Sequence, residues 1–122
     1  MSAHPIVHLE ISAKDTSAAS KFYADLFGWK IDFDPKFDYY QFEAEGGPGG
    51  GFVKVDTQTY KAGDVVAYVD TDDIEATLKK AESLGGKTLL PKTEIPGVGW
   101  FAFFTDPTGN RMGLYTSMRP QG

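Results

Sequence analysis

A histidine and a glutamate stand two residues apart near the start of the chain, in the stretch HLEI at residues 8–11. On a β-strand, residues i and i+2 point to the same face, so His8 and Glu10 would share one face, opposite Leu9 and Ile11. An imidazole titrates near neutral pH, and beside a carboxylate it could act in general acid/base catalysis. The pair could equally begin a metal site, or be two polar groups bonded to each other or to water. His8 and Glu10 are therefore the candidate catalytic residues.

The residues around this pair predict one strand, one helix and three further strands. Alternation of apolar and polar residues predicts a strand at 6–11, and an apolar stripe at helical spacing predicts a helix at 16–27. Asp15 is a candidate N-cap, and Gly28 is a natural stop. Further strands are predicted at 29–33, 39–44 and 52–55. The helical stripe that should face inward consists of Ala19, Phe22, Tyr23, Leu26 and Phe27.

The same order of elements returns in the second half of the chain. A strand is predicted at 65–69 and a helix at 73–84, with Asp72 and Glu75 spaced as a capping box. Strands at 87–90, 99–105 and 111–116 follow, and the polar segment 56–64 is the predicted connector. The sequence thus predicts an α+β protein with one domain over 1–122, built from βαβββ modules at 1–56 and 64–118.

Three stretches carry a resemblance to a known family: HLEISAKDTSAASKFYADLFGWK, VDTDDIEATLKKAESLGGK and IPGVGWFAFFTDPTGNRMGLY. Together they resemble the vicinal oxygen chelate superfamily, also called the glyoxalase/bleomycin-resistance/dioxygenase fold. The likeness is greatest to its small, single-domain, glyoxalase-like proteins of bacteria and archaea. The resemblance implies two βαβββ modules whose sheets curl into an open barrel around a cavity.

The resemblance also implies where a metal would bind and which ligands are missing. Metal-binding members of the superfamily carry His, Glu or Gln on the first and last strands of each module. His8 occupies the first of these places, whereas the other three fall at Val66, around Gly51 and at Gly113. A catalytic metal usually has about three protein ligands, so we expect no metal and no other cofactor.

Aromatic residues and one arginine are the candidate ligand-binding residues. Aromatics make up 14% of the chain and could line a pocket for a flat or apolar molecule, although about half should be ordinary core. Arg111 could clamp an anion or form a rim salt bridge. The glycine-rich run at 46–51 lacks the Lys-Ser or Lys-Thr of a phosphate loop, and we interpret it as a flexible loop or hairpin end. The candidates are Tyr40, Phe42, Tyr68, Trp100, Arg111 and Tyr115.

Composition excludes several classes of function. The net charge is −5 with no basic stripe, which excludes ordinary nucleic-acid binding. No apolar run approaches the roughly 20 residues of a membrane span, and there is no cysteine. We expect a cytoplasmic homodimer that contacts neither nucleic acid nor membrane.

Three functions compete at this point. The first is a small-molecule-binding glyoxalase-like protein without the usual metal site, with metal-free acid/base activity as an extension of it. The alternative is a divalent-metal-dependent lyase, isomerase or dioxygenase with unusual ligands. The third is a dimeric interaction module without a ligand.

Overall fold

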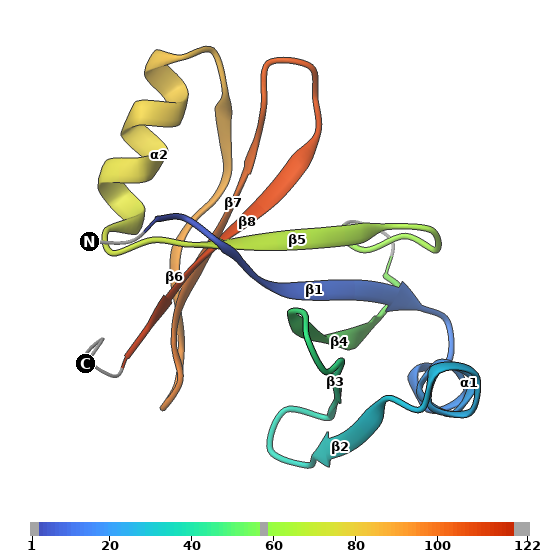
Figure 1. Cartoon of the computed structure of the whole chain (residues 1–122). Coiled ribbons are helices and arrows are strands. Elements are labelled where there is room, and N and C mark those ends of the chain that lie inside the picture. Colours follow the sequence, from blue (N-terminus) through green and yellow to red (C-terminus); the bar gives the residue numbers. More distant parts are fainter. Residues whose placement is uncertain (1–2, 57–58, 119–122) are drawn as a thin grey trace. The chain divides into compact units, whose positions relative to one another are not determined.

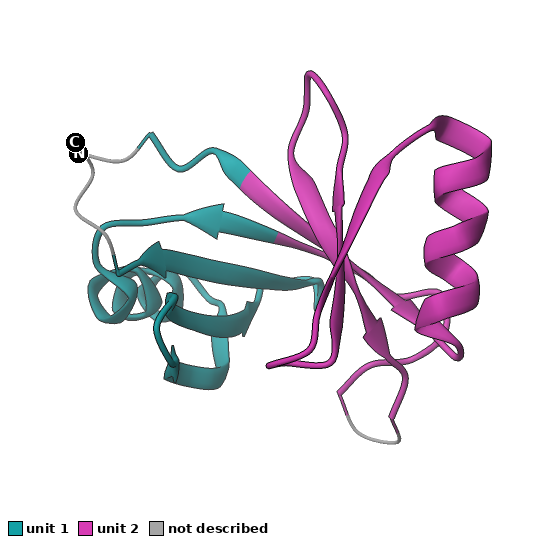
Figure 2. Ribbon diagram, turned by 90° about the horizontal axis from the view of Figure 1, so that it is seen from below, with its two compact units in different colours: residues 1–6, 68–122 teal, residues 7–67 magenta. Residues whose placement is uncertain are grey.

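The computed structural model describes residues 3–56 and 59–118 of the 122-residue chain. Its elements follow the order β1 (Ile6–Ala13), α1 (Thr16–Phe27), β2 (Lys30–Asp34), β3 (Tyr39–Glu43), β4 (Gly49–Lys54), β5 (Val65–Asp70), α2 (Ile74–Ser83), β6 (Lys87–Ile95), β7 (Gly99–Thr105) and β8 (Arg111–Ser117). The predicted α+β class and the doubled βαβββ order are confirmed. The chain divides into two compact units, unit 2 (residues 7–67) and unit 1 (residues 1–6 and 68–122), which Figure 2 distinguishes by colour.

Unit 2 holds a sheet with the strand order β2-β3-β4-β1, in which β4 runs parallel to β1 and antiparallel to β3. Helix α1 packs against β2, β3 and β4. The Asp15 side chain caps its start by accepting from the Ala18 N–H at 3.0 Å, and Gly28 ends it in the left-handed region at φ 74°. Both ends therefore lie where the sequence predicts them, because each cap needs a particular residue type.

The core of unit 2 is a stack of aromatic rings between α1 and the sheet. Phe52 is fully buried and Phe42 is 3% exposed. The ring of Phe42 lies 4.5 Å from that of Trp29, and the ring of Phe52 lies 5.6 Å from that of Tyr23. Ring pairs at these separations stabilise beyond the area that they bury.

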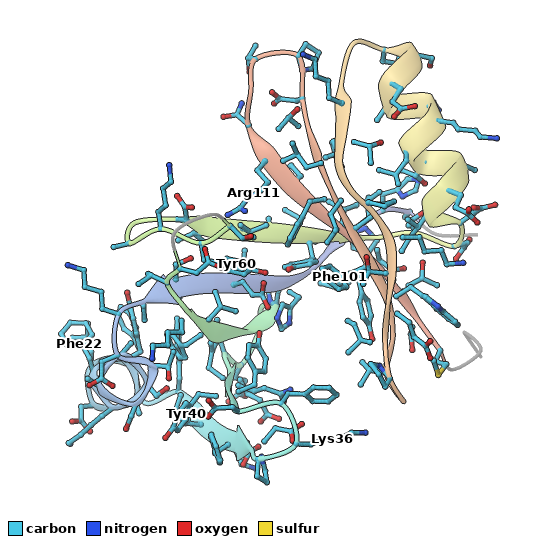
Figure 3. The ribbon with its side chains drawn as sticks, turned by 180° about the vertical axis from the view of Figure 1, so that it is seen from behind. Phe22, Lys36, Tyr40, Tyr60, Phe101 and Arg111 are labelled. Carbon is cyan, nitrogen blue, oxygen red and sulfur yellow. The ribbon has the colours of Figure 1, made fainter. Side chains whose placement is uncertain are left out.

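The predicted inward stripe of α1 is only partly right. Tyr23 packs into the core, whereas Phe22 is 58% exposed and Leu26 is 56% exposed. Figure 3 shows the Phe22 side chain projecting from the helix. The buried face is centred on Ser20 and Tyr23, one turn apart, and this places Phe22 and Leu26 on its flank.

The interpretation of residues 46–51 as a flexible loop or hairpin end holds for 46–48, which lie in the connection between the antiparallel strands β3 and β4, and is wrong for 49–51. Strand β4 begins at Gly49, and both Gly50 and Gly51 are buried. A Cβ on Gly50 would overlap the backbone carbonyl of Leu9 on the neighbouring strand. These glycines therefore permit close packing within the sheet.

Unit 1 holds the strands β5, β8, β7 and β6 in that order, with β8 parallel to β5 and antiparallel to β7. Helix α2 packs on β6, β7 and β8 (Figure 1). Its N-cap is Asp73 rather than the predicted Asp72, and Asp73 accepts from the Ala76 N–H at 3.0 Å. The core between helix and sheet consists of Ile74, Leu78, Ala102 and Leu114, with Val69, Trp100 and Phe104 packed against it.

Strand β6 runs on to Ile95, well beyond the predicted end at residue 90. Its register with β7 shifts twice between Thr88 and Thr93. Such shifts interrupt the alternation of apolar and polar residues from which the full length of the strand could have been predicted. No helix in the described ranges 3–56 and 59–118 is long and apolar enough to cross a bilayer.

Replacing Phe52 with Ala should lower the free energy of unfolding by about 3–5 kcal/mol, because it leaves a cavity in a ring stack that cannot collapse. Phe33→Ala is the control, since Phe33 is 47% exposed and touches mainly Tyr40. Urea unfolding followed by tryptophan fluorescence measures both. Equal losses for the two variants would contradict this assignment of the core.

Candidate functional site

The two candidate catalytic residues lie on one face of the unit 2 sheet, as their spacing predicts. His8 lies opposite Gly49 and Glu10 opposite Gly51 in the parallel pairing of β1 with β4. The side chain of Glu10 is 13% exposed and that of His8 is 32% exposed. Their nearest polar atoms, His8 Nε2 and Glu10 Oε2, are 3.9 Å apart, so the pair is joined through a third group.

That third group is Tyr39, which the sequence analysis did not single out. Its hydroxyl donates to Glu10 Oε2 at 3.0 Å and lies 2.8 Å from His8 Nε2. Because the hydroxyl hydrogen is used toward Glu10, the contact with His8 requires an Nε2–H that donates to the Tyr39 oxygen. The tautomer of His8 is assigned by this network.

Strand parity was the signal that could have found Tyr39. Phe42 and Tyr40 share the face of β3 that packs toward α1, so Tyr39 and Gln41 must share the other face. The predicted cavity residues Tyr40 and Phe42 therefore lie on the face opposite Tyr39.

Burial sets the protonation states of the network. Burial lowers the pKa of His8 below its ordinary value of 6.5, and the nearby Glu10 carboxylate offsets this in part. Burial also raises the pKa of Tyr39, and the Glu10 charge and hydrogen bond raise it further. At neutral pH the network therefore consists of a neutral imidazole, a neutral phenol and the acceptor oxygen of Glu10.

A tyrosine ring stands over each of the two glycines where the superfamily resemblance implies a metal ligand. In unit 2, a Cβ on Gly51 would coincide with the hydroxyl end of Tyr39. In unit 1, a Cβ on Gly113 would lie 2.5, 2.7 and 2.9 Å from three ring atoms of Tyr68. Neither position has room for a side chain while these rings stay in place.

The residues present do not fit the metal site of the superfamily. Val66 is 2% exposed and has no donor atom. Within residues 3–56 and 59–118, no group of three or more His, Cys, Asp or Glu side chains is arranged to hold a metal ion. His8 and Glu10 are two donors, and a third is missing.

The structure distributes the predicted ligand-binding residues over both faces of the sheets. In unit 1, Tyr68, Arg111 and Tyr115 share the face of Gly113, as predicted from parity, and the Arg111 guanidinium lies 5.3 Å from the Phe103 ring centre. Trp100 lies on the opposite face and packs into the α2 core. In unit 2, Tyr40 lies beside Phe33, with ring centres 4.7 Å apart.

Unit 2 also contains a pocket of about 210 Å³ next to His8. Half of its lining residues are polar, so it is less aromatic than the predicted cavity. Phe42 is the one predicted ligand-binding residue in its wall. The lining residues are Val7, His8, Asp32, Gln41, Phe42, Glu43, Gly49 and Gly50.

Comparison with known proteins gives one family match and several relatives. A sequence profile of the Glyoxalase/Bleomycin resistance protein/Dioxygenase superfamily matches residues 5–114. The protein named "Putative glyoxylase CFP32" of Mycobacterium tuberculosis is 31% identical over 131 residues, covering 93% of this chain and 46% of that protein. The chain thus spans about half the length of this relative. A glyoxylase-like domain-containing protein of Didymella fabae is 34% identical over 116 residues, covering 88% of this chain and 90% of that one.

Solved structures share the fold at low sequence identity. Methylmalonyl-CoA epimerase from Mycobacterium tuberculosis superposes with a TM-score of 0.72 at 13% identity, covering 98% of this chain and 93% of that one. At this identity the likeness concerns the fold.

Stability should depend on pH through His8. Its pKa is lowered in the folded protein, so below 6.5 the unfolded chain binds a proton that the folded chain does not. The free energy of unfolding should therefore fall as pH drops from 6.5 toward the lowered pKa, and level off above 6.5. His8→Gln should remove this contribution. Urea unfolding between pH 5 and 8, with His4→Gln in both proteins so that they differ by the His8 imidazole alone, measures it. An NMR titration giving His8 a pKa above 6.5 would contradict the burial argument.

Proposed function

Because the chain belongs to the Glyoxalase/Bleomycin resistance protein/Dioxygenase superfamily, we propose that it binds a small organic molecule beside His8 and Glu10 and transfers a proton to or from that molecule without a metal ion. The observation that carries this proposal is the hydrogen-bonded chain from His8 through Tyr39 to Glu10. A half-buried pair of ionisable groups next to a pocket, with the pKa of its imidazole lowered by burial, is a typical arrangement for acid/base chemistry.

Each group of the chain has a distinct part in this chemistry. Glu10 and the neutral imidazole of His8 are proton acceptors, and either one becomes a donor once it is protonated. The Tyr39 hydroxyl fixes the orientation of both groups and lets a proton pass between them, since it accepts from one and donates to the other. A bound molecule must present its acidic C–H or O–H group within hydrogen-bond reach of His8 or Glu10.

The predicted ligand-binding residues support the proposal to different degrees. Tyr68, Arg111 and Tyr115 share the face of Gly113 in unit 1, and their part in ligand binding stays a prediction from the sequence. Phe42 borders the pocket beside His8, but its ring packs on Trp29 on the face toward α1, which argues against direct contact with a ligand. Trp100 and Tyr40 pack on the helix-facing sides of their sheets, which argues against direct contact with a ligand.

A metal-dependent lyase, isomerase or dioxygenase is the second candidate. Superfamily membership favours it, but the missing donors at Val66, Gly51 and Gly113 argue against it. An interaction module without a ligand is a third, and the buried acid/base pair argues against that function. A cytoplasmic location and the absence of nucleic-acid partners stay as predictions from composition.

The ligand prediction is tested with the protein as purified. Native mass spectrometry should detect a bound small molecule, and His8→Gln and Glu10→Gln should each weaken its binding about tenfold, as expected for loss of a hydrogen bond to a charged or buried group. Glu75→Gln on α2 is the matched control and should leave affinity unchanged. If no compound co-purifies, a thermal-shift screen of small carbonyl and hydroxyl compounds takes its place. The proposal fails if no compound stabilises the wild type more than His8→Gln.

We further propose that the protein forms a homodimer. Phe22, Leu26 and Phe27 on α1 are each more than half exposed, and surplus apolar surface commonly marks an interface. Closed twofold pairing is the commonest assembly of this kind. Light scattering at micromolar concentration should give twice the chain mass of 13.3 kDa. A mass of one chain would contradict the dimer.

A further inference from the structure

The Tyr39 hydroxyl lies between the two groups that would begin a metal site. It is 2.8 Å from His8 Nε2 and 3.0 Å from Glu10 Oε2, which are themselves 3.9 Å apart. A zinc ion bound to an imidazole nitrogen and a carboxylate oxygen lies about 2.0–2.2 Å from each. Such an ion would lie between these same two atoms, on which the contacts of the Tyr39 hydroxyl now converge.

The same side chain also closes the position of a third ligand. Gly51 is the direct neighbour of Glu10 across the parallel pairing, so a donor at position 51 would face the same side. A Cβ on Gly51 would coincide with the hydroxyl end of the Tyr39 ring. One side chain thus bridges the first two donors and prevents a third.

We propose that Tyr39 replaces a divalent cation in this protein, with its hydroxyl joining His8 to Glu10 and its ring blocking position 51. Both atoms that an ion would bind are used: the carboxylate oxygen accepts the hydroxyl hydrogen, and the imidazole N–H points at the hydroxyl oxygen. A neutral phenol is not among the donors that zinc prefers, so Tyr39 does not itself supply a ligand. This inference rests on the proposed metal-free function and names the residue responsible for it.

The replacement should be reversible by two substitutions. Tyr39→Ala removes both the bridge and the obstruction, and Gly51→Glu supplies a second carboxylate beside Glu10. Together with His8, this gives one imidazole and two carboxylates on adjacent strands, which is the number of protein ligands that a catalytic zinc site usually has. The double variant should therefore bind one Zn²⁺ per chain.

The experiment is calorimetric titration of metal-free protein with Zn²⁺. Tyr39→Ala/Gly51→Glu should bind at least 100-fold more tightly than the wild type, and adding His8→Ala should abolish the gain. Tyr39→Ala/Gly47→Glu is the matched control, because Gly47 has open space around it and its carboxylate lies outside the site. Circular dichroism establishes that each variant is folded. If the double variant does not fold, Tyr39→Ser alone should bind Zn²⁺ about tenfold more tightly than the wild type.

Two results would overturn the inference. One is a folded double variant, or a folded Tyr39→Ser where that variant is used, that binds Zn²⁺ no more tightly than the wild type. The other is a wild-type protein that already binds one Zn²⁺ per chain through His8, and this result would remove the proposed metal-free function as well. Failure of the variants alone removes only the role of Tyr39, since the ligand experiment uses neither substitution at position 39 nor added metal.

Discussion

The contact of the Tyr39 hydroxyl with His8 and Glu10 above Gly51 is the constraint on which the candidate site depends. It requires that β1, β4 and β3 keep one register, because the three polar residues come from two strands that are separated by the third. A slip of one residue in β3 would turn Tyr39 toward α1 and place Tyr40 over the site. The aromatic packing of Phe42 and Phe52 on the other face of the same strands opposes that slip. The core beneath α1 thus holds the hydrogen-bonded chain in place.

The order and type of the elements could be predicted from the sequence, whereas the identity of the central site residue could not. Apolar periodicity and caps such as Asp15 and Gly28 depend on neighbours close in sequence. These local signals predicted both ends of α1 correctly. The choice between Tyr39 and Tyr40 depends on which face of β3 packs on the helix, and this is a contact between distant segments. The glycines at the start of β4 were not predicted to lie in a strand for the same reason, because their role depends on Leu9 and Tyr39 on other strands.

Both units show the same relation between a glycine and a tyrosine, reached from different strands. Tyr39 comes from β3 and covers Gly51 on the neighbouring β4, whereas Tyr68 comes from β5 and covers Gly113 on the neighbouring β8. Tyr68 is 6% exposed, so its ring contributes buried apolar area as well as filling the space. A glycine without the ring above it would leave a gap in each sheet face, and gaps cost packing energy. A large ring from the neighbouring strand fills that space, so the glycine and the tyrosine fit each other in each unit.

Tyr39 and Tyr68 fill the space over their glycines with different parts of the side chain. Tyr68 fills its place mainly with ring atoms, but Tyr39 ends in a hydroxyl between an imidazole and a carboxylate. A phenylalanine would fill the same volume but remove the hydrogen bonds that Tyr39 makes with His8 and Glu10, each worth about 0.5–1.5 kcal/mol. The hydroxyl satisfies both because it is a donor and an acceptor at once. A side chain that only closed the metal site could be apolar, whereas one that keeps the acid/base pair oriented must carry this hydroxyl. The proposed exclusion of a cation and the proposed metal-free proton transfer therefore depend on the same hydroxyl.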